Sequence, residues 1–131
     1  MPRLIDSHAH LADPAFDDDR DAVIERARAT GVEAIVAVGE SLPAAARARG
    51  LAAAFPRFVY HTAGVHPHDA AAYDAARDLP AIREELATGA VAVGECGLDY
   101  HYDHSPRELQ RRAFAGQLAL AAETGSAVIV H

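Results

Sequence analysis

The chain has 131 residues, of which 50% are hydrophobic, and a formal net charge of -7 at pH 7. This composition is typical of a folded globular domain and excludes a disordered or low-complexity chain. The acidic balance excludes a broad surface that coats nucleic acid, because such surfaces are basic. A phosphate-containing substrate remains compatible with the charge, since bound divalent cations would reverse the local field.

The apolar runs of the sequence bear on where the protein is located, and its cysteine content bears on which side chains could bind a metal. No apolar run approaches the roughly 20 residues of a membrane helix, and the N-terminus lacks the apolar core of a signal peptide. These features predict a cytoplasmic protein with no membrane partner. Cys96 is the single cysteine, so the sequence contains neither an intrachain disulfide nor a CxxC motif. Any metal site therefore has to be built from histidine and carboxylate side chains.

Short apolar runs alternate with helical patterns along the whole chain. Strands are predicted, in chain order, at residues 4–6, 34–38, 58–65, 91–93 and 127–130. Helices are predicted between them, at residues 20–29, 44–55, about 80–87, and 105 to about 123. Ser105 is the expected N-cap of the last helix, and Gly125 is its stop signal.

This alternation predicts an α/β fold in which helices cover a parallel sheet. Polar residues follow four of the predicted strands, namely His8 and His10, His66 and His68, Glu95, and His131. In a TIM barrel the active site is built at this carboxyl face from several strand ends. A doubly wound sheet would carry a Gly-rich loop after its first strand, and this sequence has none there. The pattern therefore favours a barrel, and five strands leave that barrel incomplete.

Three features carry the predicted chemistry. Residues two apart on a strand point to the same face, so His8 and His10 can bind one cation together. Glu95 follows the apolar residues 91–94, and its two oxygens allow it to bridge two cations. A glutamate that caps a helix or pairs with an arginine is the structural alternative. His131 follows the apolar residues 127–130 and is expected at the same face.

Taken together, these motifs resemble the TatD family of metal-dependent deoxyribonucleases, within the amidohydrolase-like barrel superfamily. The matching segments follow the family's order along the chain: residues 5–11, 64–68, 93–100, the helix with Gln110, Phe114, Gln117 and Leu118, and residues 128–131. The resemblance implies a TIM-barrel-type hydrolase, of which this chain contains about the first five βα units. Residues 1–131 would then be the N-terminal part of one barrel domain, truncated at the end of its fifth strand.

The resemblance also implies roles for individual residues. His8 and His10 would bind a first divalent cation, and Glu95 would be the catalytic carboxylate that bridges two cations. His131 would bind the second cation, and His66 would bind the substrate near the scissile phosphate. In the family, a further His after the sixth strand and an Asp after the eighth complete the site, and the sequence ends before both.

The implied function of the complete protein is hydrolysis of phosphodiester bonds at DNA or other nucleic-acid ends. A pair of Mg²⁺, Mn²⁺ or Zn²⁺ ions would catalyse this hydrolysis. One alternative is hydrolysis of another ester or amide, such as an aminoacyl-tRNA, because one barrel serves unrelated substrates. A second alternative is that the 131-residue chain is an inactive fragment. The parent is expected to be monomeric, whereas open sheet edges would let the fragment self-associate.

The remaining conspicuous residues receive structural interpretations. Cys96 is predicted to be a small, partly buried residue and not a nucleophile. For Asp6, a bond that orients a metal-binding imidazole and a plain structural bond are both compatible with its position. The other histidines are interpreted as loop, core or pocket-edge residues: His61, His68, His101 and His104.

Overall fold

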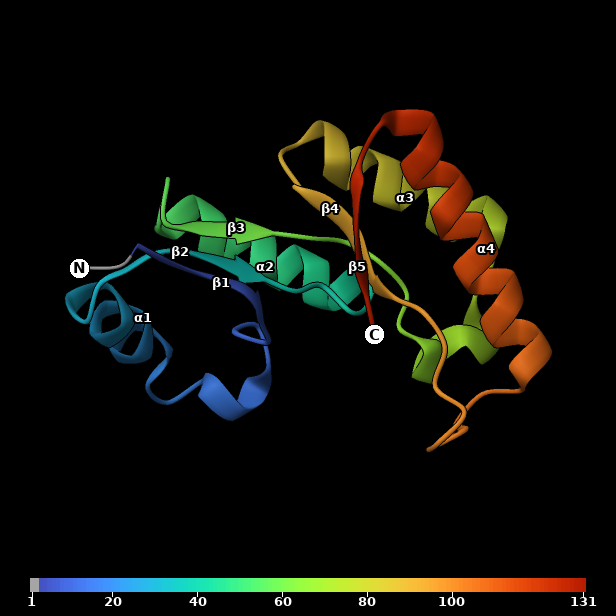
Figure 1. Cartoon of the computed structure of the whole chain (residues 1–131), viewed down its shortest axis with the longest axis horizontal. Helices are drawn as coiled ribbons and strands as arrows, with labels where there is room; N and C mark the ends of the chain where they lie inside the picture. Colours follow the sequence, from blue (N-terminus) through green and yellow to red (C-terminus); the bar gives the residue numbers. More distant parts are fainter. Residues whose placement is uncertain (1–2) are drawn as a thin grey trace.

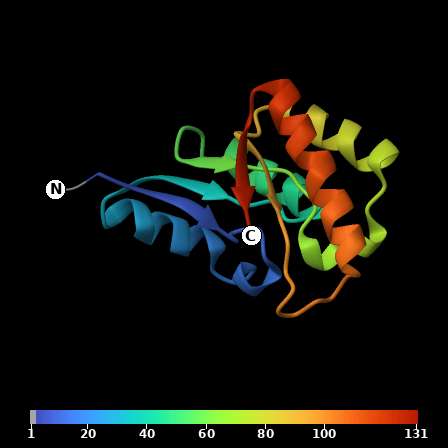
Figure 2. The same ribbon diagram turned by 45° about the vertical axis from the view of Figure 1, so that its right-hand side comes forward.

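The computed structural model describes residues 3–131, which form parallel strands with helices on one side of them (Figures 1 and 2). The strands are β1 (Leu4–Ala9), β2 (Val32–Ala37), β3 (Val59–His61), β4 (Ala92–Cys96) and β5 (Ala127–Val130). The helices are α1 (Arg20–Ala29), α2 (Leu42–Ala54), α3 (Ala75–Ala87) and α4 (Arg107–Thr124), with short 3-10 turns η1 (Pro14–Phe16) and η2 (Pro67–Ala72).

The strands pair in chain order, and every pairing is parallel. β1, β2 and β3 form one sheet, β4 and β5 form a second, and a single bridge between Ala63 and Val93 joins the two. Helices connect successive strands because a parallel pair needs a long crossover. The predicted α/β fold of alternating parallel strands and helices is therefore confirmed, and the barrel is not closed.

Small side chains let the helices pack closely on the strands. Ser41 caps α2 by accepting a hydrogen bond from the backbone N–H of Ala44, 3.2 Å away. Ala45 and Ala48 of this helix are fully buried, each in a different cluster of the core. The core therefore has two adjoining parts, one under the first three strands and one under β4 and β5.

The third strand is shorter than predicted. Residues 58–65 were expected to form it, but only Val59–His61 do, although the following residues stay beside the neighbouring strands. The reason is Thr62, whose hydroxyl accepts from the Gly39 N–H at 3.0 Å and donates to the Gly94 carbonyl at 2.6 Å. The Thr62 hydroxyl thus takes the place of regular backbone hydrogen bonds between strands. Strand propensity cannot predict such a contact.

The starts of α3 and α4 also differ from the prediction. α3 begins near Asp74, which accepts from the Ala76 N–H at 2.9 Å, so Pro80 lies inside the helix instead of opening it. α4 begins after Pro106, and Ser105 is not its cap. The Ser105 hydroxyl instead donates to the His68 carbonyl at 2.8 Å and accepts from the Ala71 N–H at 3.1 Å. Ser105 therefore joins η2 to the loop before α4.

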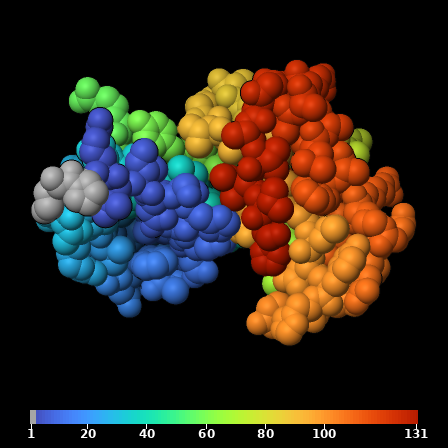
Figure 3. All heavy atoms as spheres, in the orientation of Figure 1, coloured from blue at the N-terminus to red at the C-terminus, as the bar shows by residue number. Residues whose placement is uncertain are grey.

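The first and fourth strands extend beyond their predicted ends, so His8 and Glu95 lie within the last residues of β1 and β4 and not after them. The outer edges of β1 and β5 carry no paired strand among residues 3–131. Figure 3 shows a hollow between the blue segment that contains β1 and the red segment that contains β5. No helix within this part of the chain is long and apolar enough to cross a membrane.

Candidate metal centre

Three predicted ligands meet at the carboxyl ends of β1 and β4. The Nε2 atoms of His8 and His10 lie 3.2 Å apart, and each lies 3.4 Å from Oε2 of Glu95. Glu95 is only 3% exposed, and this oxygen has no hydrogen-bond partner among residues 3–131. Leaving a buried carboxylate oxygen unpaired is costly, so the convergence of these atoms fits a bound cation.

The other oxygen of Glu95 faces the end of β5. Nδ1 of His131 lies 2.9 Å from Oε1 of Glu95 and 3.2 Å from Nε2 of His66. The two carboxylate oxygens therefore face two separate groups of histidines. The structure brings all five residues that the sequence analysis singled out into one site: His8, His10, His66, Glu95 and His131.

Close strand packing holds Glu95 in this position. The preceding residue, Gly94, has a φ of 140°, which L side chains rarely adopt. A Cβ there would lie 2.4 Å from the carbonyl oxygen of Ile129, so β4 and β5 could not approach as they do. Gly94 thus lets the bridging carboxylate and His131 share one face.

The hydrogen bonds around His66 determine its tautomer. The backbone N–H of His68 donates to Nδ1 of His66 at 3.0 Å, so the neutral ring carries its proton on Nε2. Burial lowers the pKa of His66 to about 4, which keeps the ring neutral near pH 7. His66 therefore presents an N–H donor to the centre. Such a donor suits a phosphate oxygen better than a cation.

Asp99 has no predicted role from the sequence, yet its carboxylate organises the second group. Oδ2 accepts from Nε2 of His131 at 2.8 Å and from Nε2 of His68 at 2.7 Å. Oδ1 accepts from the backbone N–H of Tyr102 at 2.9 Å. The Tyr102 bond, followed by the bonds from the two histidines, holds the pKa of Asp99 well below its usual range. The one signal in the sequence is its place four residues after Glu95 in a matching segment.

The contacts of His131 fit a bound cation. Its Nε2 proton is directed to Asp99, as is common for metal-binding histidines. With Glu95 ionised, a second proton on Nδ1 would oppose the N–H of His66, whereas a bare lone pair would face a carboxylate oxygen at 2.9 Å. A cation bound between Nδ1 and Oε1 would remove the conflict with the carboxylate. Burial lowers the pKa of His131, but its bonds to Asp99 and Glu95 outweigh burial and raise it overall.

Glu40 is a second site residue that the sequence did not reveal. It follows β2, and its Oε2 lies 3.5 Å from Nδ1 of His10 with no hydrogen-bond partner within residues 3–131. A carboxylate beside the outer nitrogen of His10 favours a proton there and leaves Nε2 free to face Glu95. Glu40 thus lies next to the outer nitrogen of His10 in the first group, and Asp99 lies next to the outer nitrogen of His131 in the second.

The histidine, aspartate and cysteine side chains that were interpreted as structural make the following contacts. His68 lies in η2 with its Nε2 held by Asp99, and His61 is buried with its Nε2 3.1 Å from Glu85. Asp6 accepts from the backbone N–H of His8 at 3.1 Å, which is a plain structural bond. Cys96 is fully buried, and burial raises the pKa of its thiol to about 12, so the thiolate of a nucleophile does not form near neutral pH.

Two buried glutamines of α4 fix the loops that carry the site. Gln117 accepts from the Val65 N–H at 2.8 Å and donates to the Val65 carbonyl at 3.1 Å, directly before His66. Gln110 makes the same pair of bonds with the backbone of Asp99, at 2.7 and 3.2 Å. Each amide therefore replaces the backbone partner that an irregular segment lacks.

Replacing Gln117 by Leu is expected to lower the free energy of unfolding by about 2–3 kcal/mol, because the N–H and C=O of Val65 would stay buried without partners. Urea denaturation monitored by circular dichroism would measure the change. Leu118→Ala, on the exposed side of the same helix, is the matched control and should change stability by less than about 1 kcal/mol. Equal losses in the two variants would contradict this role of Gln117.

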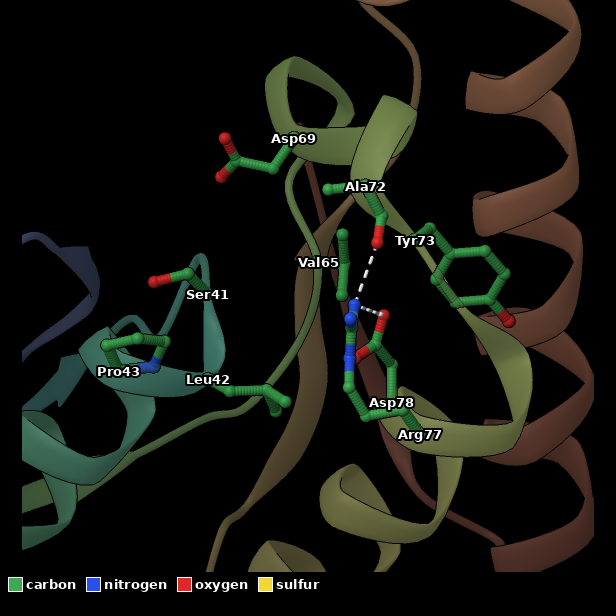
Figure 4. A pocket seen from close by; sticks show the side chains of 9 residues that line it. All are labelled: Ser41, Leu42, Pro43, Val65, Asp69, Ala72, Tyr73, Arg77 and Asp78. Atoms are coloured by element: carbon green, nitrogen blue, oxygen red, sulfur yellow. Dashed lines mark hydrogen bonds and ion pairs between the residues drawn. The ribbon is translucent and has the colours of Figure 1, made fainter.

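A largely apolar pocket lies beside the centre but shares none of its histidines. Its volume is about 460 Å³, and Figure 4 shows that it opens between the start of α2, η2 and the start of α3. The only arginine in it, Arg77, donates to Asp78 at 2.7 Å and to the Ala72 carbonyl at 2.7 Å. Because these charges are engaged with each other, we assign the chemistry to the histidine and carboxylate cluster.

Comparison with known proteins gives consistent matches over almost the whole chain. Residues 5–131 match the family described as TatD related DNase. The chain is 43% identical to the "Uncharacterized metal-dependent hydrolase YabD" of Bacillus subtilis and 41% identical to the "3'-5' ssDNA/RNA exonuclease TatD" of Edwardsiella piscicida. Each alignment covers 98% of this chain but only 50% and 49% of the relative, so the chain spans about half the length of these proteins.

Solved structures agree with these matches. The crystal structure of YJJV, a TatD homologue from Escherichia coli, is 31% identical and superimposes with a TM-score of 0.85 over 98% of this chain and 50% of that one. A hydrolase of the TatD family from Entamoeba histolytica is 23% identical, with a TM-score of 0.82 over 94% of this chain and 47% of that one, and it supports the fold alone.

Proposed function

The chain belongs to the TatD related DNase family, and on that premise we propose that the complete protein is a metal-dependent nuclease acting on the ends of nucleic-acid strands. Residues 1–131 would be the N-terminal part of its barrel domain. The Edwardsiella piscicida relative, named a 3'-5' ssDNA/RNA exonuclease, supports a nucleic-acid substrate over an aminoacyl ester. The observation that supports this proposal most directly is that the two oxygens of Glu95 face two different histidine groups.

Two divalent cations fit this donor set. His8, His10 and Oε2 of Glu95 would hold the first, and Oε1 of Glu95 with Nδ1 of His131 would contribute to the second. When bound, such a pair activates water and neutralises charge on the attacking and leaving oxygens of an in-line displacement. Ligand type admits Mg²⁺, Mn²⁺ or Zn²⁺.

The surrounding side chains would orient the ligands and the substrate. Asp99 accepts a hydrogen bond from Nε2 of His131, and the carboxylate of Glu40 lies 3.5 Å from Nδ1 of His10, so that the nitrogens facing Glu95 would keep their lone pairs toward it. The Nε2–H of His66 would donate to an oxygen of the scissile phosphate. A neutral donor there binds the phosphate without competing for the cations.

A substrate panel tests this function. The full-length protein, freed of metal and then supplied with Mg²⁺, Mn²⁺ or Zn²⁺ in turn, is incubated with end-labelled single-stranded DNA, single-stranded RNA, duplex DNA and an aminoacyl-tRNA. We expect metal-dependent release of nucleotides from a strand end. Intact strands under all three metals would refute the nuclease assignment, and release of amino acid alone would replace it with ester hydrolysis.

A further inference from the structure

The segment between β4 and α4 projects beyond the carboxyl ends of β4 and β5, as the orange chain in Figure 1 shows. It carries several aromatic side chains, among them Tyr100, which is 37% exposed, and Tyr102, which is 65% exposed. Burial normally stabilises a large aromatic side chain, so its exposure next to a functional centre calls for a functional reason.

The exposed ring is held in a defined orientation. Its plane is parallel to that of His104, at 2° and 5.9 Å between ring centres, and it meets the rings of His101 and His68 edge to face at 4.7 and 6.0 Å. The backbone N–H of Tyr102 donates to Oδ1 of Asp99 at 2.9 Å. A ring fixed in this way loses little conformational entropy when a planar group stacks on it.

The same carboxylate connects the ring to the proposed metal centre. Oδ1 of Asp99 holds the backbone of Tyr102, while Oδ2 accepts from Nε2 of His131, whose Nδ1 faces Glu95. The ring is therefore positioned relative to the cations by one buried side chain. A strand whose end phosphate lies at the cations would have its nearby nucleotides next to this segment.

The charges at the segment and at the start of α4 favour contact with a base over contact with a phosphate. Arg107 lies over the ring of Tyr100, 4.4 Å from its centre, and pairs with Asp103. Arg111 pairs with Glu108 and donates to the Tyr100 hydroxyl at 3.1 Å. Because each of these half-exposed arginines is already paired with a carboxylate of the protein, the feature left for a strand to contact is the exposed face of the Tyr102 ring.

We propose that Tyr102 forms a stacking surface for an unpaired base, close to the end of the strand that is cut. This inference rests on the proposed nuclease function and specifies its substrate. Aromatic rings stack on bases of every kind, so the contact would tolerate any sequence. It would still favour single strands, because in a duplex both faces of a base are covered by its neighbours.

The test combines a protein variant with an altered substrate. Tyr102→Ala in the full-length protein is compared with the wild type on a single-stranded oligonucleotide and on a series in which one of the last three nucleotides lacks its base. On the normal strand we expect KM to rise roughly 10-fold with kcat nearly unchanged. On the strand that lacks the stacked base, the wild type should already show the higher KM, and the variant should raise it no further.

Two variants serve as references. Tyr102→Phe keeps the ring and should restore the low KM, whereas Tyr60→Ala removes another exposed tyrosine, on β3 and outside the site, and should leave both constants unchanged. An equal rise in KM on every oligonucleotide, or no rise on any, would overturn the stacking role while the nuclease function stands. If the wild type cleaves none of these strands, the proposed function fails first and the inference fails with it.

Discussion

Glu95→Gln in the full-length protein is expected to lower kcat/KM for phosphodiester hydrolysis by well over about 100-fold while the fold stays intact. Loss of a residue that orients a metal ligand already lowers activity or metal affinity by about 10- to 100-fold. In the proposed site, Glu95 would contact both cations itself. The amide keeps the size of the side chain but has one oxygen and no charge. Its buried environment makes this loss severe, because no solvent can replace the missing ligand atom.

Activity and metal content measured together check this prediction. Thermal unfolding shows whether the fold survives, and metal analysis should give fewer than two equivalents per chain. Glu123→Gln is the matched control, since this exposed glutamate of α4 pairs with Arg83 on the surface and the change should leave both readouts unchanged. Unchanged turnover of Glu95→Gln at saturating metal would refute the bridging role.

Residues 1–131 expressed alone are expected to hydrolyse nothing at a useful rate and to self-associate. The outer edges of β1 and β5 are open within residues 3–131, and apolar side chains lie exposed on them, with Leu4 at 52%, Ile5 at 65% and Val130 at 57%. A closed barrel needs about eight strands. Open edges with exposed apolar residues pair with other chains.

Sedimentation velocity, metal analysis and a nuclease assay beside the full-length protein test the expectation. Metal binding should be weak, because the further His and Asp that the resemblance implies for the complete site would come from the half of the relatives that this chain does not cover. The result that would contradict us is a monomer that binds metal stoichiometrically and retains near-parent activity. It would mean that either the site or the fold has been misjudged.

The sequence by itself determined the α/β architecture and the residues that meet at its carboxyl edge. Local patterns were sufficient because parallel strands end at one face, so His8, Glu95 and His131 were expected to converge once the strands were placed in a barrel. The separate orientations of the two oxygens of Glu95 were not determined in this way. They depend on how closely β4 approaches β5 at Gly94.

Only the tertiary structure decided which groups surround these residues. Asp99 accepts a hydrogen bond from His131, 32 residues away, Gln117 holds the backbone before His66 across 52 residues, and Thr62 replaces ladder bonds across 23 and 32 residues. Such bonds fix the tautomers of the histidines and the ends of β3. Propensity and periodicity describe neighbours along the chain, whereas a hydrogen bond depends on distance and angle in space, and folding alone sets those.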